Sequence, residues 1–577
     1  MAAFRDAAGS NLAAALVDGL LQLGVRDAFG VSGGAMAAFW HAMSASRLRV
    51  CHFHHESGAA FAASEAHFAT SRPVLVFTTT GPGLTNALTG LMAARDEGAK
   101  VILVSACSSA AARGRFAIQE TTPESMPSGL FRAGPLFHFA EVLEHTTDLA
   151  RVLHELSRGL SRRGGFLAHV AVPTALQAMP AVCPDAPMPQ VAFDGGVTPQ
   201  VLQDCLHALA DDSFAIWLGF GARAAAVEVR ALVEHSGAAV FCTPRGKGIV
   251  PETHPQFIGV TGMGGHDSVA EWVATHAPAR ILVLGSRLGE ASSFWDARFV
   301  PRGGFIHVDL DPEVPGAAYP AVPTLGIVAD IGALLRGLLT LLHKPSSARA
   351  APPALPMARP AIAPMTLPDS RRVRPEILMD AVQRHVVDAT DAIVLADSGN
   401  AFIWTTHRLR FAHPGRYRVS TAMGAMGHAA AGVVGAALGH GGRAVAVVGD
   451  GSMLMNNEIN TAVKYRACAV WIVLNDARYG MCAQGMHSLG LNADALFPAV
   501  DFVAFAKAQG ADGVRVSHEQ ELDAALQLAM HATGPFVVDV LIDVRAHAPS
   551  AARNRALELQ MADPRAAGIP DLCYPTH

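Results

Sequence analysis

The sequence predicts an α/β protein of three domains, each a largely parallel sheet flanked by helices. The chain has 577 residues, which is too long for a single domain. Proline-rich segments at 178–200 and 344–374 predict extended linkers, and they leave domains of about 1–180, 195–343 and 370–577. Within each domain, short apolar runs alternate with amphipathic stretches of helical length, a pattern typical of parallel strands joined by crossover helices.

The clearest unit lies in the third predicted domain. Residues 445–448 predict a buried strand, and the glycines of Gly449-Asp450-Gly451-Ser452 allow a tight turn after it. Residues 456–466 have apolar positions at helical spacing, and residues 470–474 predict a second strand. Two parallel strands joined by a helix end at the same edge of a sheet, which is where open α/β sheets bind ligands.

Two acidic residues, Asp450 and Asp476, follow these strands. Mg²⁺ prefers oxygen ligands and commonly bridges one or two protein carboxylates to substrate phosphates. A Gly-Asp-Gly-Ser run alone is a common turn, so the metal interpretation depends on the second acid, 26 positions after the first. The spacing favours a site for a divalent cation that in turn holds a diphosphate.

The run from Gly449 to Asp476 resembles the thiamine diphosphate motif, and residues 473–481 are similar to its acetolactate synthase version. The resemblance implies that Asp450, Asp476 and the backbone carbonyl of Arg478 bind Mg²⁺. Many relatives have Asn where this chain has Asp476, and both residues offer an oxygen ligand. The resemblance also implies cofactor contacts from other residues of the run, namely Gly451, Ser452, Tyr479, Gly480 and Met481.

A thiamine enzyme also needs a carboxylate that protonates the pyrimidine ring of the cofactor, so that the ring can activate the thiazolium carbon. Such a carboxylate must sit in an apolar pocket to hold a proton near neutral pH. Glu56 begins a small, apolar helix and is the candidate. Taken alone, it is better explained by the preference of acidic residues for a helix N-terminus. Residues 72–90, however, resemble the acetolactate synthase segment that follows the catalytic Glu.

The resemblance extends to further positions. Gln119 resembles the active-site Gln of carboligases, although a solvated loop would also carry such a residue. Met426 resembles the residue that bends the cofactor into a V shape, or it fills the core, since Met packs adaptably. His428 is either a proton donor near the cofactor or a hydrogen-bonded core histidine. Other positions that the resemblance places at the cofactor are Gly33, Pro82, Asn86, Gly399, Asn400 and Gly424.

The second predicted domain gives mixed signals. Residues 216–223 predict a strand followed by a glycine turn, on which a nucleotide could bind. The Ala-Arg pair at 222–223 and the run at 244–251 also occur in flavin-binding acetolactate synthases. Residues 285–291 depart from the family, because Ala291 stands where the relatives have the arginine that binds the substrate carboxylate. Both FAD and branched-chain amino-acid synthesis therefore stay open.

Composition excludes several other classes. The net charge of −5 provides no basic surface for nucleic acid, and no run of 18 or more purely apolar residues predicts a membrane span. The first residues do not resemble a signal peptide. Eight scattered cysteines without a CxxC pair favour free thiols in a reducing cytoplasm.

The resemblance implies a thiamine diphosphate enzyme that decarboxylates a 2-oxo acid such as pyruvate and ligates the carbanion to an acceptor carbonyl. Decarboxylation or C–C cleavage without ligation is the alternative enzyme, and an inactive regulatory subunit with the thiamine fold is the alternative outside catalysis. A plain dehydrogenase would depend on Gly219-x-Gly221 alone. The resemblance further implies a homodimer or homotetramer, with Glu56 of one subunit meeting Asp450 of another.

Overall fold

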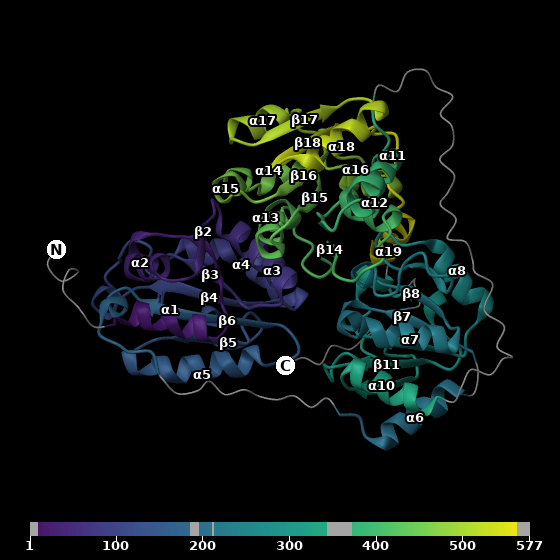
Figure 1. Cartoon of the computed structure of the whole chain (residues 1–577), viewed down its shortest axis with the longest axis horizontal. Coiled ribbons are helices and arrows are strands. Elements are labelled where there is room, and N and C mark those ends of the chain that lie inside the picture. Colours follow the sequence, from purple (N-terminus) through teal and green to yellow (C-terminus); the bar gives the residue numbers. More distant parts are fainter. Residues whose placement is uncertain (1–9, 185–195, 211–212, 343–371, 562–577) are drawn as a thin grey trace.

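The computed structural model describes residues 10–184, 196–210, 213–342 and 372–561 (Figure 1). Most of the two segments predicted as linkers lies outside these residues, as does the chain beyond residue 561. Three separate six-stranded sheets form, and every strand pairing within them is parallel. This architecture confirms the predicted fold class, and each predicted domain range encloses one sheet.

The N-terminal domain has the strand order β2-β1-β3-β4-β6-β5. Its strands are β1 (Asp27–Val31), β2 (Arg49–His52), β3 (Val74–Thr78), β4 (Lys100–Cys107), β5 (Phe139–Val142) and β6 (Phe166–Pro173). Helices α1 (Leu12–Gln22), α2 (Ala37–Ala45) and α5 (Leu149–Leu160) contribute to the core on one face, and α3 (Glu56–Thr70) and α4 (Pro82–Glu97) to the core on the other.

The central domain has the order β12-β11-β10-β7-β8-β9, in which two three-stranded halves run outward from the middle as in Rossmann folds. Its strands are β7 (Phe214–Leu218), β8 (Ala239–Cys242), β9 (Phe257–Val260), β10 (Arg280–Leu284), β11 (Phe305–Asp309) and β12 (Thr324–Val328). Its helices are α6 (Pro199–Ala210), α7 (Ala226–Ser236), α8 (Asp267–His276), α9 (Glu290–Ser293) and α10 (Ile331–Leu341).

The C-terminal domain repeats the topology of the first, with the order β14-β13-β15-β16-β18-β17. Its strands are β13 (Ile393–Ala396), β14 (Tyr417–Val419), β15 (Ala444–Gly449), β16 (Ala469–Asn475), β17 (Asp512–Val516) and β18 (Phe536–Leu541). Its helices are α11 (Pro375–Val382), α12 (Asn400–Arg408), α13 (His428–His440), α14 (Asp450–Met455), α15 (Ile459–Tyr465), α16 (Gly480–Ser488), α17 (Phe502–Ala508), α18 (Leu522–His531) and α19 (Ala551–Met561).

The helix predicted at 456–466 begins later than expected, and a helix that was not predicted precedes it. Helix α14 begins directly at Asp450, where a turn was expected, and the predicted helix at 456–466 becomes α15 after a break at residues 456–458. Asn456 leaves helical geometry with φ −156° and donates from Nδ2 to Ser57 Oγ at 3.1 Å. Glu458 accepts from the backbone of His54 at 3.2 Å. The break exists because both side chains bond to the N-terminal domain, a contact that local periodicity does not report.

Helices α3 and α13 join the first and third domains (Figure 1). Their facing residues are mostly Ala and Gly, which lets the backbones approach closely. A Cβ atom added to Gly435 would lie only 1.9 Å from the carbonyl oxygen of Ala62, so no larger residue fits there. Among the described residues, no helix has the length and apolar character needed to cross a membrane.

Candidate active site

A cavity opens at the carboxyl ends of the strands of the C-terminal sheet, where β13, β15 and β16 lead into their helices. Eleven of the residues predicted for cofactor or metal line it: Gly399, Asn400, Met426, Asp450, Gly451, Ser452, Asp476, Arg478, Tyr479, Gly480 and Met481. The sequence motif and the fold thus bring together side chains from four separate segments. Gly424 does not line this cavity; it belongs to the adjacent loop.

The two predicted acidic ligands lie side by side. The Asp450 carboxylate accepts hydrogen bonds from the backbone N–H groups of Gly451 at 2.8 Å, Asp476 at 3.0 Å and Ala477 at 2.6 Å. Burial raises the pKa of Asp450 to about 6, against the effect of these bonds. Burial and then repulsion from Asp450 raise the pKa of Asp476 to about 7. Two crowded carboxylates of this kind gain from a cation between them.

The cavity fits a divalent cation that carries a diphosphate. Among the described residues, no cluster of three or more His, Cys, Asp or Glu side chains could hold a metal by itself. A cation at Asp450 and Asp476 would therefore need additional oxygens, such as a backbone carbonyl and phosphate groups. Asn400 Oδ1 is buried without a hydrogen-bond partner among the described residues, beside Gly480, where a Cβ atom would lie 2.9 Å from Asn400 Nδ2.

Gly451 lies where the cavity has no room for a side chain. A Cβ atom there would lie 2.9 Å from the Tyr479 ring and 3.3 Å from Met426 Cε. Met426 therefore points into the site rather than filling the core, as the cofactor interpretation expected. At Gly449, two residues earlier in the chain, an added Cβ would meet nothing within 4 Å.

Asp397 begins the 397–400 segment, which the resemblance places at the diphosphate, but Asp397 itself does not line the cavity. Its buried carboxylate accepts from the backbone of Gly427 at 3.0 Å, Ala429 at 2.9 Å and Ala430 at 3.0 Å. It thereby fixes the start of α13 directly after Met426. Its buried place at the end of apolar strand β13 accounts for these bonds, because buried polar groups are nearly always hydrogen-bonded.

The Glu56 half of the site lies in the N-terminal domain. Glu56 is buried at the first position of α3, and Asn86 Nδ2 donates to its Oε2 at 3.1 Å. Pro82 opens α4, the helix that carries Asn86. A Cβ atom at Gly83 would lie 3.3 Å from Glu56 Oε1. Helix α4 thus holds the glutamate in one orientation, which is what a positioned proton donor requires.

Gln119 and Gly33 border the same region. Gln119 is exposed, has φ +55°, and accepts from Thr80 Oγ1 through its Oε1 at 3.2 Å. Gly81 packs against it, with an added Cβ only 2.9 Å from Gln119 Cβ. Gly33 leaves no room for a side chain beside Thr79 Oγ1, which a Cβ would approach to 2.5 Å. The chain therefore brings the predicted N-terminal residues to one end of its sheet.

In the described part of one chain, the C-terminal cavity does not extend to the Glu56 half of the site. The residues that line the C-terminal cavity lie between Pro375 and Ala546, and none belongs to the described part of the N-terminal domain. His54 and His55 contact Glu458 instead, with both backbone N–H groups donating to its carboxylate. These histidines serve the domain junction, as expected for residues that flank a helix start.

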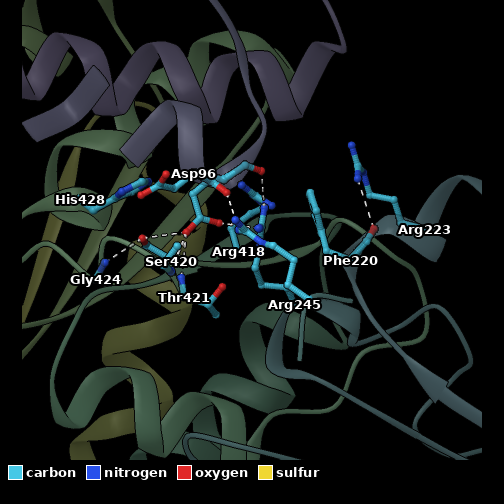
Figure 2. Close-up of polar contacts among 12 residues, drawn as sticks. Asp96, Phe220, Arg223, Arg245, Arg418, Ser420, Thr421, Gly424 and His428 are labelled. Atoms are coloured by element: carbon cyan, nitrogen blue, oxygen red, sulfur yellow. Dashed lines mark hydrogen bonds and ion pairs between the residues drawn. The ribbon is translucent and has the colours of Figure 1, made fainter. Parts of the chain in front are cut away.

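A buried carboxylate from α4 holds the loop at 420–424 (Figure 2). Glu97 Oε1 accepts from Ser420 Oγ at 3.0 Å and from the backbone N–H groups of Thr421 at 2.9 Å and Ala422 at 3.3 Å. Ser420 Oγ in turn accepts from the Gly424 backbone at 3.3 Å. Arg245 of the central domain pairs with Glu97 Oε2 at 2.6 Å, so Glu97 contacts both of the other domains.

A second buried carboxylate, that of Glu65, neutralises Arg418 in the same junction. Arg418 Nε donates to Glu65 Oε2 at 3.0 Å, and His428 Nε2 lies 2.9 Å from Glu65 Oε1. Burial alone would raise the pKa of Glu65, but Arg418 and His428 outweigh it and hold that pKa at about 2. His428 is therefore a hydrogen-bonded core histidine, which was one of its two predicted interpretations.

The central domain has its own cavity at the carboxyl ends of its strands, lined by residues that include Gly221, Gly285, Asp309 and Asp330. Gly219 and Gly221 pack directly on Gly285, because Cβ atoms there would approach its backbone to 2.3 and 2.9 Å. Arg223 does not line this cavity; its guanidinium lies 3.8 Å from the Phe220 ring centroid. The glycine turn is thus explained by packing alone, and FAD stays an open question.

A cavity that fits a cation and a diphosphate on one domain, with a positioned glutamate on another, is the arrangement expected of the thiamine diphosphate-dependent enzymes. Family models agree with this class along the chain. The N-terminal TPP binding domain of the thiamine pyrophosphate enzymes matches residues 10–126, their central domain residues 209–338, and their C-terminal TPP binding domain residues 397–540. The chain belongs to this family and is acetolactate synthase-like.

Individual relatives match over most of their length. The chain is 28% identical to a probable chloroplastic acetolactate synthase of Oryza sativa, covering 92% of this chain and 83% of the relative. It is 28% identical to a putative acetolactate synthase large subunit of Mycobacterium tuberculosis, over 87% and 92%. A solved thiamine diphosphate-dependent 4-hydroxybenzoylformate decarboxylase of Rhodococcus jostii shares the fold, with a TM-score of 0.79, 21% identity, and coverage of 92% and 99%.

Proposed function

We propose that this enzyme decarboxylates a 2-oxo acid of the pyruvate type and ligates the resulting carbanion to an acceptor carbonyl. The observation that carries the proposal is the complete Glu56–Asn86 arrangement in a chain whose relatives, over most of their length, include proteins named acetolactate synthase. A degenerate regulatory copy would have no need to retain it. The same arrangement argues against the non-catalytic alternative and against a plain dehydrogenase.

Each predicted residue has a role in this reaction. Asp450, Asp476 and the carbonyl of Arg478 would hold Mg²⁺ and through it the diphosphate, while Met426, which lines the same cavity, would support the ring system. Thiamine diphosphate, when bound, supplies the electron sink for the carbanion. Glu56, oriented by Asn86, holds and returns the proton at the pyrimidine ring. Gln119, an exposed residue of the N-terminal domain, would orient the acceptor oxygen.

We also propose a homodimer or a dimer of dimers, in which Glu56 of one subunit completes the cavity of another. The separation of the two halves within one chain supports this assembly. The loop that carries Gln119 supports it as well, since Phe116 and Ile118 are 97% and 93% exposed. Large apolar side chains exposed beside a site are typical of surfaces that a partner covers.

A reducing compartment such as the cytoplasm fits the thiols. Cys51, Cys107 and Cys205 are buried and free, and burial raises the pKa of each thiol to about 12, which keeps it protonated and unreactive. The seven cysteines in the described part of the chain form no disulfide.

Product analysis tests the proposed function. Purified enzyme with thiamine diphosphate, Mg²⁺ and pyruvate should release CO₂ and form acetolactate, detected as acetoin after acid treatment. If free acetaldehyde is the only product, the enzyme is a simple decarboxylase and the proposed ligation is wrong. An absorption spectrum of the purified protein near 450 nm decides the FAD question in the same preparation.

A further inference from the structure

The first turn of α3, which carries Glu56, is held by residues 456–458 of the C-terminal domain. Glu458 is only 1% exposed, and its carboxylate accepts hydrogen bonds from two consecutive backbone N–H groups. The N–H of His54 lies 3.2 Å from each carboxylate oxygen, and the N–H of His55 lies 3.3 Å from Oε1. The two residues directly before Glu56 are therefore fixed to a different domain.

The residue directly after Glu56 is fixed by the same segment. Ser57 Oγ accepts a hydrogen bond from Asn456 Nδ2 at 3.1 Å. Gly58 leaves the space that these contacts need, because an added Cβ atom would lie 2.8 Å from Glu458 Oε1 and 2.9 Å from Asn456 Oδ1. The chain is thus fixed on both sides of Glu56, and no side chain fits between α3 and the segment that holds it.

These contacts determine the direction in which Glu56 extends. His55 is the N-cap of α3, with an extended backbone, and Glu56 is the first helical residue. The direction of the Glu56 Cα–Cβ bond depends on the peptide planes that lead into the helix, and Glu458 binds the N–H groups of two of them. Asn86 fixes only the far end of the side chain, at Oε2. A proton donor has to lie within hydrogen-bond distance of its partner atom, so both ends of the side chain matter.

Glu458 has no cation to neutralise it. In the described part of the chain, no Lys or Arg lies within ion-pair distance of its carboxylate; the side chains that contact it are Thr461, which donates to Oε2, and His54, whose Nδ1 lies 3.2 Å from Oε2. Burial raises the pKa of Glu458. An unpaired buried carboxylate destabilises the folded chain unless its hydrogen bonds offset the cost. Outside its own helix, those hydrogen bonds all go to the two residues that precede Glu56.

We propose that Glu458 is a positioning residue for Glu56, and that its bonds to the backbone of His54 and His55 orient the glutamate toward the pyrimidine ring. The inference rests on the role of Glu56 in the proposed function and does not depend on ligation. What matters is the pair of acceptor oxygens, not the charge. A glutamine could satisfy the same partners, because its Oε1 can accept from both N–H groups while its Nε2 donates to Thr461 Oγ1.

Deuterium exchange in the holoenzyme measures this role without any substrate. Glu56 promotes the release of the proton on the thiazolium carbon, so in D₂O that proton is replaced by deuterium from the solvent. Acid quenching followed by proton NMR of the released cofactor gives the rate. Glu458→Met, which offers no acceptor, should slow the exchange at least about 10-fold. Glu458→Gln should stay within about 3-fold of the unaltered holoenzyme, because it keeps the hydrogen bonds.

Two further single variants serve as a second test and a control. Gly58→Ala keeps the Glu458 carboxylate but displaces it, so it should also slow the exchange at least about 10-fold, and it carries the test if Glu458→Met does not fold. Glu521→Met is the matched control. Glu521 likewise accepts from two consecutive backbone N–H groups before a helical turn, but that turn is not part of the Glu56 site, and the exchange rate should not change.

A double variant separates positioning from stability. Glu56→Gln combined with Glu458→Met should exchange within about 2-fold of Glu56→Gln alone, because a residue that acts through Glu56 has no effect once that carboxylate is gone. A further large loss in the double variant overturns the inference, since Glu458 would then act through the fold or the bound cofactor.

The remaining outcomes are equally decisive. Unchanged exchange in Glu458→Met overturns the inference, and equal slowing by Glu458→Met and Glu458→Gln overturns it too, because the charge and not the orientation would then matter. Both results leave the proposed function intact. Unchanged exchange in Glu56→Gln overturns the inference together with the proton role of Glu56. Exchange that depends on Glu458 in an enzyme that releases only acetaldehyde supports the inference and overturns the proposed ligation.

Discussion

Replacing Glu97 by methionine tests whether this residue supports cofactor binding through the 420–424 loop or only through the stability of the domain junction. Glu97 accepts three hydrogen bonds from residues 420–422 and pairs with buried Arg245. Each hydrogen bond contributes about 1 kcal/mol, so the loop loses about 3 kcal/mol of anchoring, which corresponds to roughly 100-fold in an equilibrium constant. The unpaired Arg245 costs a further 3–5 kcal/mol or so of stability.

The assay combines two measurements on the apoprotein. Fluorescence titration with thiamine diphosphate at saturating Mg²⁺ gives the cofactor affinity, and a thermal scan gives the unfolding midpoint. We expect Glu97→Met to weaken the affinity roughly 100-fold, because Gly424 and Met426 follow the released loop, and to lower the midpoint clearly. Glu228→Met, which removes the exposed ion pair with Arg336, should change neither value.

A double variant decides between the two effects. Glu97→Met with Arg245→Met removes both charges, and apolar replacement of a whole buried pair is often neutral or stabilising. The unfolding midpoint should therefore return toward that of the unaltered protein, while the cofactor affinity stays roughly 100-fold weaker. If the affinity recovers together with the midpoint, Glu97 acts only through overall stability and our reasoning about the loop is wrong.

Three further predictions concern the site itself. Glu56→Gln should lower CO₂ release at least about 100-fold with little change in cofactor affinity; turnover at the unaltered rate would refute the proton role. Because Asp476 and Asp450 have pKa values raised to about 7 and 6 in the metal-free site, protons compete with Mg²⁺, and Mg²⁺-dependent cofactor binding should weaken as the pH falls from 8 to 5.5. Asp476→Asn should move this loss of cofactor binding to lower pH, because the variant lacks the Asp476 carboxylate and its repulsion of Asp450. An unchanged pH profile would contradict the assignment of these two residues as metal ligands. Gly451→Ala should reduce cofactor affinity at least about 10-fold, because the added methyl group pushes Tyr479 and Met426 apart. Gly449→Ala, with open space around its Cβ, should bind the cofactor normally. Equal effects of the two variants would contradict the conclusion that the cavity is too narrow for a side chain at Gly451.

Local sequence predicted the parts of this protein that depend on short stretches of chain. The strand before Asp450, the strand before Asp476 and the helix that starts at Glu56 all form close to the expected bounds, because period and glycine placement determine them. The three parallel sheets confirm the fold class.

Contacts between distant residues could not be predicted in this way. The division of α14 from α15 depends on Asn456 meeting Ser57, 399 positions earlier. The bonds from the 420–424 loop to Glu97 span more than 300 positions, and Arg553 meets Gly485 only because α19 folds back over α16. Glu97 and Arg553 carry no local signal, since a lone charged residue usually occupies a solvated helix face.

Helix α4 carries site-forming residues at both ends. Near its beginning Asn86 steadies Glu56, and 11 residues later, about 17 Å along the helix, Glu97 secures the 420–424 loop of the same chain. In the proposed dimer, Glu56 would act on the cofactor bound by the partner, while the loop would contact the cofactor bound by its own chain. Helix α4 would therefore contribute to two active sites. A displacement of α4 would therefore change a contact at each of the two sites.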